Sequence, residues 1–467
     1  MTKKILLALV VMLAGTNAFA ANHYIRAAAT GAHNGTDWTN AWTSFSQVSW
    51  TRGDVYYVAA GSYGSATFSQ GANGSTVIEI RAAVGGSGDH GTSTGWSDSF
   101  EGQALFTGMT FSSSFWTVNG QKRGSDWQSG YLIKVNHAGT GGQAIQLGNG
   151  SQVGNFDFDY VEAQGSNVHA NSSDEGFNCT PGPCNNVIVH HSWVHNVGCD
   201  LFSFNQNVGQ NLTIEYSWLS YNNFGATAGN HCQGIQVTHS TLTIRYNVWQ
   251  DIQSSAVITD AAGGNATLTE WDIYGNIFFW DAAWNASVKG NGNVGEDNGI
   301  IGLYNVPNAN GNVRFYNNTI DGLALSNAGP CTAQAILLNS GNQVNFFDEN
   351  NIWSNIGSGC AYGAGNGTGT IDYNGYYKVS GGKGDGGSHS FSSSTNPYVN
   401  QPAGPIAGFM LSADTPAGVQ LPAPFNVDML GTPRGSDGVW NIGPLQISGA
   451  TSSLPATPQG LQVISIQ

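Results

Sequence analysis

The sequence predicts an all-β chain wound into a solenoid, in which short coils stack and each strand lies parallel to its counterpart in the next coil. Two observations favour this fold class. A short pattern of alternating apolar and polar residues recurs through the middle of the chain, and the composition suits turns and strands, with 65 Gly, 14 Trp, 17 Tyr and 21 Phe. Only 9% of the residues are charged. Exposed helix faces are rich in Glu, Lys and Arg, so we expect little helix.

The recurring pattern is that of a short, half-buried strand. A strand of about five residues cannot bury its apolar face alone, so the coils must stack in parallel to form a shared core. Matching polar positions in successive copies lie 25 to 42 residues apart, which corresponds to one coil with loops of different length. The copies are 156–160, 187–193, 212–218, 242–248, 271–277 and 313–319, and 344–352 fits with a slip of one residue.

A small polar residue follows each copy of the pattern. It is Ser or Asn, whose side chain can bond to backbone amides of the adjacent coil where a tight corner would otherwise leave them without partners. We therefore expect a structural ladder along this corner of the solenoid. Its predicted members are Ser192, Ser217, Asn247, Asn276 and Asn318.

A second ladder is formed by the polar positions within the pattern, which include Asp159, His190, Glu215 and Arg245 on successive coils. Asp159 and Glu215 should stand two coils apart, about 9 to 10 Å at the backbone from the usual strand spacing. Flexible side chains could bring the two carboxyl groups to the separation of about 6.5 to 9.5 Å used by inverting glycosidases. The alternative, which we favour, is an exposed ladder of ion pairs that avoids stacking like charges.

Both ends of the chain resemble a known fold family. The opening segments 24–27, 35–42 and 52–63 are similar to the first coils of the right-handed parallel β-helix (pectin-lyase-like) superfamily, and 428–443 is similar to its closing segment. The resemblance extends over most of 21–445 and implies a right-handed parallel β-helix with a polysaccharide or cell-surface glycan as its partner. The superfamily contains lyases, hydrolases, epimerases and non-enzymatic surface proteins, so the reaction depends on the site.

Three segments on successive coils resemble the polygalacturonase-type glycoside hydrolases, in which acidic residues on two adjacent coils and a His on the next surround the scissile bond. The resemblance implies that Asp174 and Asp200 are the catalytic carboxylates, one as general acid and one as base, with His231 to orient them. The Arg-x-Lys pair of that family is absent, which argues against galacturonate as the substrate. The segments are 171–177, 198–204 and 230–235, and the residues that we expect to bind substrate are Glu175, Gln233, Arg245 and Glu215.

Two other functions remain open. A calcium-assisted polysaccharide lyase would need a base beside the uronate carboxyl group and a cation to hold the resulting negative charge. Glu175, Asp200 and Asp260 could gather a calcium ion from neighbouring coils, since hard cations take several carboxylate oxygens. The other alternative is a non-catalytic surface or matrix protein that binds glycans through its long face. We predict no further cofactor, and no metal site formed by the scattered histidines.

The beginning of the chain predicts export. A basic start and an apolar run over 5–14 precede a small-x-small cleavage site at 18–20, so residues 1–20 have the pattern of a secretory signal peptide. The product would be extracellular or periplasmic. We expect a β-helix domain over 21–446, followed by a tail rich in Ser, Thr and Pro over 447–467.

The formal net charge of −15 argues against nucleic acid and anionic membranes as partners, because both attract Lys and Arg. No later apolar run approaches the length of a membrane span, so we expect no membrane insertion. We also expect a monomer. Six cysteines in an exported chain suggest three disulfides, with buried free thiols as the alternative. The expected pairs are Cys179–Cys184, Cys199–Cys232 and Cys331–Cys360.

Overall fold

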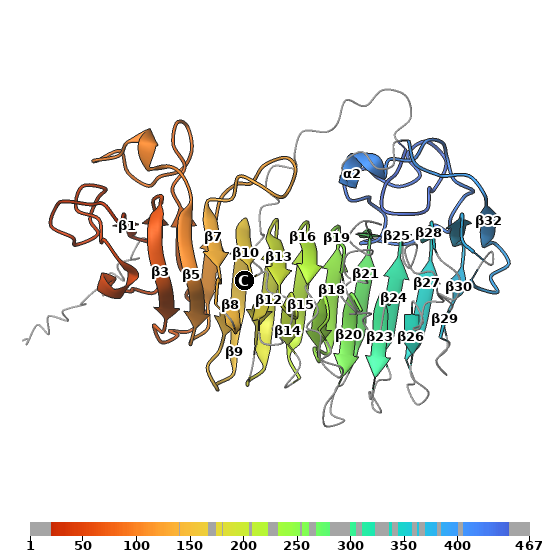
Figure 1. Cartoon of the computed structure of the whole chain (residues 1–467), viewed down its shortest axis with the longest axis horizontal. Coiled ribbons are helices and arrows are strands. Elements are labelled where there is room, and N and C mark those ends of the chain that lie inside the picture. Colours follow the sequence, from red (N-terminus) through yellow and green to blue (C-terminus); the bar gives the residue numbers. More distant parts are fainter. Residues whose placement is uncertain are drawn as a thin grey trace, which may run out of the picture.

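The chain is almost entirely β, and its named strands pair in parallel along one long axis (Figure 1). It is a right-handed parallel β-helix, as the sequence predicts. The computed structural model describes residues 20–139, 141–166, 174–179, 181–204, 208–222, 232–252, 255–260, 268–280, 299–304, 311–322, 336–338, 344–356, 362–363, 369–380, 384–399 and 405–447.

One strand of each coil belongs to a 12-stranded sheet, here called sheet A. Its strands alternate inward-facing apolar and outward-facing polar residues, which explains the period of two in the sequence pattern. The strands are β1 (Asn22–Ile25), β2 (Val55–Val58), β4 (Ile78–Ala82), β6 (Trp116–Asn119), β9 (Val153–Asp159), β12 (Cys184–His190), β15 (Gln210–Glu215), β18 (Thr241–Arg245), β21 (Glu270–Tyr274), β24 (Asn312–Tyr316), β27 (Asn345–Glu349) and β30 (Ile371–Asp372).

The remaining strands form a 20-stranded sheet in which two ladders run side by side, joined by the long strands β3 (Gly61–Phe68) and β5 (Ala104–Phe111). The ladder that follows sheet A in each coil is called B1, and the next is called B2. B1 contains β7 (Ile133–Asn136), β10 (Val161–Gln164), β13 (Trp193–Val197), β16 (Trp218–Asn222), β19 (Val248–Gln250), β22 (Ile277–Phe279), β25 (Thr319–Asp321), β28 (Ile352–Ser354), β31 (Gly375–Tyr377) and β32 (Phe391–Ser393). B2 contains β8 (Gly142–Leu147), β11 (Asp174–Asn178), β14 (Phe202–Phe204), β17 (Ile235–Val237), β20 (Val257–Asp260), β23 (Ile301–Tyr304), β26 (Ile336–Leu338) and β29 (Tyr362–Gly363).

The register of sheet A confirms the repeat that the sequence pattern predicts. Asp159 of β9 pairs with His190 of β12, and His190 pairs with Glu215 of β15. The same alignment continues through Arg245 of β18 to Tyr274 of β21. Polar residues that are far apart in the sequence therefore become neighbours on adjacent coils.

The corner between sheet A and B1 contains the predicted Ser and Asn ladder. Asn247 Oδ1 accepts the backbone N–H of Ser217 at 2.9 Å, and Asn276 Oδ1 accepts that of Asn247 at 3.0 Å. Each amide also donates to the preceding coil, as Asn276 Nδ2 does to the carbonyl of Ile244 at 2.9 Å. The ladder is confirmed, and it extends further than predicted. Its members are Ser192, Ser217, Asn247, Asn276, Asn318, Asn351 and Asn374.

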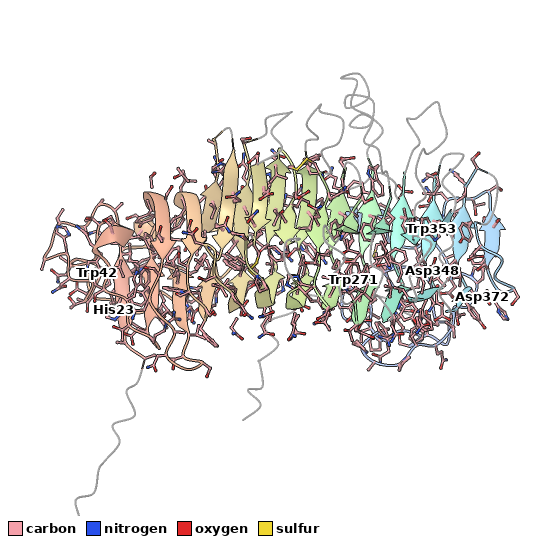
Figure 2. All side chains as sticks on the ribbon, turned by 90° about the horizontal axis from the view of Figure 1, so that it is seen from below. His23, Trp42, Trp271, Asp348, Trp353 and Asp372 are labelled. Atoms are coloured by element: carbon pink, nitrogen blue, oxygen red, sulfur yellow. A yellow bond between two sulfur atoms is a disulfide. The ribbon has the colours of Figure 1, made fainter. Side chains whose placement is uncertain are left out.

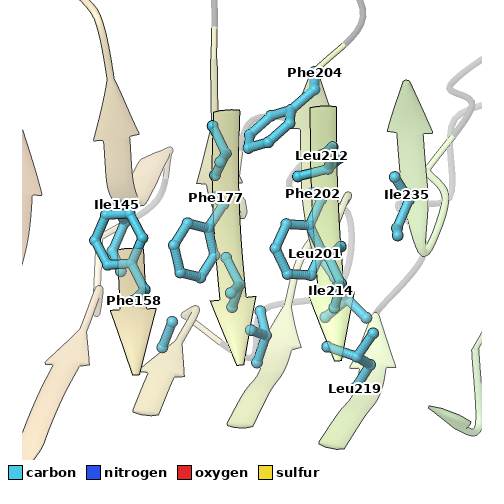
Figure 3. Packing of buried hydrophobic residues seen from close by; sticks show 14 of the residues in the cluster. Ile145, Phe158, Phe177, Leu201, Phe202, Phe204, Leu212, Ile214, Leu219 and Ile235 are labelled. Atoms are coloured by element: carbon cyan, nitrogen blue, oxygen red, sulfur yellow. The ribbon is translucent and has the colours of Figure 1, made fainter. Parts of the chain in front are cut away.

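The interior is filled by apolar side chains stacked coil upon coil. Phe177 and Phe202 lie on adjacent coils with ring centroids 5.1 Å apart, and Ile235 continues the stack on the next coil (Figure 3). Trp271 and Trp353, labelled in Figure 2, are buried in the same core further along the helix. Burial of one such side chain contributes roughly 1.5 to 3 kcal/mol, so the shared core accounts for the stacking.

The segment 405–447 packs on the outside of the helix (Figure 1). It begins with the short helix α2 (Pro405–Gly408). The Phe425 ring meets Tyr274 and Tyr316 edge-on, so the segment shields one corner of the later coils from water. No helix within the described ranges is long and apolar enough to cross a membrane. Two short 3-10 helices lie in the first coils, η1 (Phe45–Gln47) and η2 (Asp98–Phe100).

Two disulfides, Cys179–Cys184 and Cys199–Cys232, form as predicted. They fit an oxidising compartment. The third predicted pair, Cys331–Cys360, lies outside the described residues. The same is true of residues 1–19 of the predicted signal peptide and of residues 448–467 of the predicted tail.

Candidate active site

Polar residues on neighbouring coils form a row at the start of the B2 strands. Each lies in its strand or just before it. Glu175 pairs in register with Gln143 of the preceding coil. The register of β11 with β14 places Asp200 beside Glu175, and that of β14 with β17 places Gln233 beside Asp200. The stacking of coils therefore brings two carboxyl groups and two amides into one line, here called the B2 row.

Asp174, which precedes Glu175, is a fully buried carboxylate that fixes its own corner. Its Oδ2 atom accepts the backbone N–H of Ser166 at 2.8 Å, the hydroxyl of the same residue at 2.6 Å and the backbone N–H of Gly198 at 2.8 Å. Its Oδ1 atom has no hydrogen-bond partner within the described ranges. Burial raises the pKa of Asp174, although the three donors oppose that effect. Asp174 thus ties the start of β11 to Ser166 and to Gly198.

Glu175 and Asp200 form a pair of adjacent carboxyl groups. Burial raises the pKa of Glu175 to about 7, although hydrogen bonds, first of all from Asn178, act in the opposite direction. Asp200 is only 2% exposed, and burial followed by repulsion from Glu175 raises its pKa well above the ordinary value. Its Oδ1 atom accepts the backbone N–H of Gln233 at 2.5 Å. Carboxyl groups this close hinder each other's ionisation, so the pair retains a proton where isolated carboxyl groups have lost theirs.

The disulfide Cys199–Cys232 fastens the B2 row, because its cysteines immediately precede Asp200 and Gln233. Gln233 is fully buried, and its Oε1 atom accepts the backbone N–H of Ser255 at 2.8 Å. Its Nε2 atom has no partner among the residues that the structure describes. Buried polar atoms without partners are rare, so this amide and the free oxygen of Asp174 are groups that a ligand could satisfy.

The predicted site residues fall into two separate places. Asp174, Glu175, Asp200 and Gln233 lie together at the B2 row, whereas His231 lies outside the described residues. The remaining two predicted residues, Glu215 and Arg245, lie on sheet A, on a different face of the coil. They form an ion pair in which Arg245 Nε is 2.5 Å from Glu215 Oε2.

The alternating ladder on sheet A consists of ion pairs between coils, which is the interpretation that we favour from the sequence. His190 lies between Asp159 and Glu215 in the register, and Arg245 follows Glu215. His191, the next residue, lies with its Nδ1 atom 2.9 Å from Asp159 Oδ1. Opposite charges therefore alternate from coil to coil, and the carboxyl groups of Asp159 and Glu215 are separated by an imidazole.

The strand register gives Glu175 a more central place than the sequence motif does. The motif pairs Asp200 with Asp174, whereas the register sets Glu175 beside Asp200. The signal was present in the sequence, because Phe177 and Phe202 each follow a carboxyl residue by two positions. Aligning these inward-facing phenylalanines identifies Glu175 as the neighbour of Asp200.

The described part of the B2 row supplies only part of a calcium site. A calcium ion takes about six to eight oxygen ligands. Glu175 and Asp200 supply two carboxyl groups, which already accept hydrogen bonds from Asn178 and from the backbone of Gln233. The side chain of Asp260, the third predicted ligand, is not among those described. Calcium binding here therefore stays a prediction, and the chemistry below does not depend on it.

Comparison with known proteins finds a similar architecture among solved structures. No model of a known protein family matches the sequence, and no curated protein matches it either. A solved structure, the crystal structure of pectate lyase Pel9A, is similar with a TM-score of 0.46 and 14% identity, over 92% of this chain and 97% of that chain. Similarity at this level concerns general architecture alone, and the β-helix of this chain is established by its own strand register.

Proposed function

We propose that this protein is an exported hydrolase that acts on a polysaccharide, with Glu175 and Asp200 as its reacting groups. The observation that carries the proposal is the register that sets these two carboxyl groups side by side on adjacent coils. Hydrolysis of a glycosidic bond needs one protonated and one ionised carboxyl group. A coupled pair with raised pKa values supplies both near neutral pH.

In this proposal Asp200 is the general acid and Glu175 is the base. Burial, reinforced by repulsion from the ionised Glu175, raises the pKa of Asp200 well above its ordinary value, so Asp200 is the member that keeps its proton. Glu175 is the more exposed member, and its pKa of about 7 leaves part of it ionised at neutral pH. Asp200 gives its proton to the leaving glycosidic oxygen while Glu175 takes a proton from the attacking water. The water oxygen bonds to the anomeric carbon as the glycosidic bond breaks. Transfer of the proton from Glu175 to Asp200 then restores the starting state.

Asp174 and Gln233 act as positioning residues for the pair. The three hydrogen bonds to Asp174 Oδ2 tie the start of β11 to Ser166 and Gly198, and the backbone N–H of Gln233 fixes Asp200. Asp174 Oδ1 and Gln233 Nε2, which have no partner among the described residues, are buried beside the pair. His231 keeps the orienting role that the resemblance implies.

The proposed substrate is an uncharged polysaccharide. The largest causes of the pKa shifts of Asp174, Glu175 and Asp200 within the described ranges include no Lys or Arg, so the carboxylates of a polyuronate would meet repulsion from the pair. The two disulfides support export, because such bonds persist in oxidising compartments.

Degradation of a panel of uncharged polysaccharides, with polyuronates included as lyase substrates, tests the proposal. The full chain, produced with its disulfides formed, should release new reducing ends without the ultraviolet absorbance of unsaturated uronates. Asp200→Asn and Glu175→Gln should each lower the rate by at least about 100-fold, since each removes a proton-transfer group. Glu79→Gln is the matched control, because this carboxylate lies on sheet A in an early coil and should leave the rate unchanged.

Three results would contradict the proposal. Unchanged activity in Asp200→Asn would show that the Glu175 and Asp200 pair does not take part in the reaction. Unsaturated products that require calcium would identify a lyase. Retention on a glycan without any release of reducing ends would identify a binding protein.

A further inference from the structure

A second cluster of titratable side chains lies on sheet A, on a different face of the coil from the B2 row. Asp157 and Asp159 are outward-facing residues of β9, and His190 ends β12 and is followed by His191. The register pairs Asp159 with His190 on adjacent coils. These four residues are called the His/Asp cluster.

The nitrogen and oxygen atoms of the His/Asp cluster converge. His190 Nε2 lies 2.7 Å from Asp157 Oδ1, and His191 Nδ1 lies 2.9 Å from Asp159 Oδ1. The second ring nitrogen of His190, Nδ1, is 3.6 Å from Asp159 Oδ1, which is too long for a hydrogen bond. One ligand atom each from Asp159, His190 and His191 lies within 4.8 Å of the other two.

These separations suit a small metal ion. With metal–ligand bonds of about 2.0 to 2.1 Å, the ligand atoms of a tetrahedral zinc site are about 3.3 to 3.4 Å apart. The 2.9 and 3.6 Å separations at Asp159 bracket that value, so little movement is required. Asp157 already contacts the other nitrogen of His190, and a carboxylate there fixes the tautomer and orientation of a ligating imidazole.

The His/Asp cluster is held in place and is open to solvent. The ring of His191 stacks between Tyr160 and Tyr216, at centroid distances of 4.8 and 5.4 Å. The exposed fractions of the four side chains in the cluster range from 18% to 40%, so an ion can reach them.

The charges around the His/Asp cluster leave it attractive to a cation. Arg245, on the far side of Glu215, is neutralised by that carboxylate at 2.5 Å. The Arg123 guanidinium is engaged by the carbonyl of Tyr216 at 2.6 Å and lies over the Trp127 ring. The two carboxylates of the His/Asp cluster attract a cation, and a metal ion that binds an imidazole displaces its proton.

We propose that the His/Asp cluster binds a divalent first-row transition-metal ion such as zinc, with His190, His191 and Asp159 as ligands. Imidazole combined with carboxylate is a donor set that such ions favour, whereas calcium selects oxygen ligands alone. Three protein ligands leave a fourth position for water. The ion joins β9 to β12, and its binding is independent of the hydrolytic activity proposed above.

Equilibrium dialysis of the full chain against zinc tests this site. The wild type should bind one zinc ion per chain at micromolar concentration. The double variant His190→Ala/His191→Ala should lose that ion. Asp159→Asn, which keeps the shape of the side chain, should weaken binding and provides a second variant if the first does not fold. Cobalt in place of zinc should give a visible ligand-field spectrum that the double variant lacks.

His389→Ala is the matched control. His389 faces Asp372 with a Nδ1–Oδ2 distance of 2.7 Å, so it forms an imidazole–carboxylate pair on sheet A without a second imidazole. This variant should keep the zinc ion. The proposal is overturned if the wild type binds no zinc, if the double variant and Asp159→Asn retain it, or if His389→Ala loses it to the same extent.

Discussion

Two corners of each coil are built from buried polar residues, but they differ in how completely those residues are satisfied. At the corner between sheet A and B1, the Asn318 amide donates to the Ile273 carbonyl and the Asn351 amide oxygen, and its own oxygen accepts the backbone N–H of Asn276. At the B2 row, Asp174 Oδ1 and Gln233 Nε2 are without partners within the described ranges. The two corners therefore have different energetic roles.

The difference separates stability from function. A buried polar network stabilises a fold when each member is paired, whereas an unpaired group costs about 1 to 3 kcal/mol. The Ser and Asn ladder is fully paired, so we assign it to the stacking of coils. The B2 row keeps unpaired atoms and two carboxyl groups with raised pKa values, which is typical of a site that awaits a ligand.

The largest expected effect is on turnover. Glu175→Gln should lower polysaccharide hydrolysis by about 100- to 10,000-fold, because it removes the base that takes a proton from the attacking water. Asn318→Ala should leave the rate per folded molecule unchanged. Initial rates, normalised to the folded fraction measured by circular dichroism, compare the two variants. Equal losses of rate in the two variants would contradict the separate roles of the two corners.

A smaller effect is expected on removal of the disulfides. The Cys199–Cys232 disulfide joins residues 33 positions apart in the sequence, and the Cys179–Cys184 disulfide joins residues 5 positions apart. The chain-entropy relation gives about 3 to 4 kcal/mol for the first and about 2 kcal/mol for the second. Denaturant unfolding of the two double Cys→Ser variants measures these losses. Only removal of Cys199–Cys232 should also lower activity, and the opposite pattern would show that this disulfide does not hold the B2 row.

The Ser and Asn ladder should show a loss of stability of similar or smaller size. Asn318→Ala removes a buried side chain that makes four hydrogen bonds and should lower the free energy of unfolding by about 1 to 3 kcal/mol. Asn185→Ala is the control, since its exposed oxygen accepts one backbone N–H, from Gln210. Unfolding midpoints in urea should separate the two variants. A larger loss in Asn185→Ala would contradict the structural role of the ladder.

The smallest effect is on the pH dependence of stability. The folded chain keeps the Glu175 proton up to a pH of about 7, whereas the unfolded chain loses it near the ordinary glutamate pKa of 4.5. The native state binds more protons in that window, so stability should fall as pH rises from 4.5 to about 7 and then level off. Because Glu175 is partly exposed, we expect on the order of 1 kcal/mol.

Glu175→Gln should flatten this slope, as measured by urea unfolding across the window. Asp372→Asn provides a contrast of opposite sign. Although burial opposes the shift, hydrogen bonds led by that from His389 lower the pKa of Asp372 to about 2. The contribution of Asp372 to stability is present above the ordinary aspartate pKa of 3.8 and is lost only as pH falls towards 2. An unchanged slope in Glu175→Gln would mean that its proton is not retained on folding.

The fold could be predicted from the sequence because each coil repeats one local rule. Alternation within the strand sets which residues face inward, and Asn276 and Asn318 mark the corner that follows. Sheet register, as at Asp159 and His190, then follows from stacking the repeats. The fold predictions depended on the spacing of apolar and polar residues along the chain, and this spacing can be read directly from the sequence.

The candidate site was predicted only in part, since its geometry depends on relations between coils. The sequence located Asp200, but a difference of one position decided whether Asp174 or Glu175 stands beside it. The His/Asp cluster was missed because Asp159 and His191 are separated by a full coil, and isolated histidines carry no periodic signal. Contacts that depend on side-chain direction across a corner require the structure.

Carbon-13 NMR titration of the side-chain carboxyl groups tests the central claim most directly. The account predicts that Glu175 titrates with a midpoint near pH 7 and that Asp200 titrates well above the ordinary range of aspartate. It also predicts that Glu175→Gln lowers the pKa of Asp200, because repulsion from Glu175 contributes to the shift. Ordinary acidic midpoints for both groups, or no response of Asp200 to that substitution, would contradict a coupled carboxyl pair.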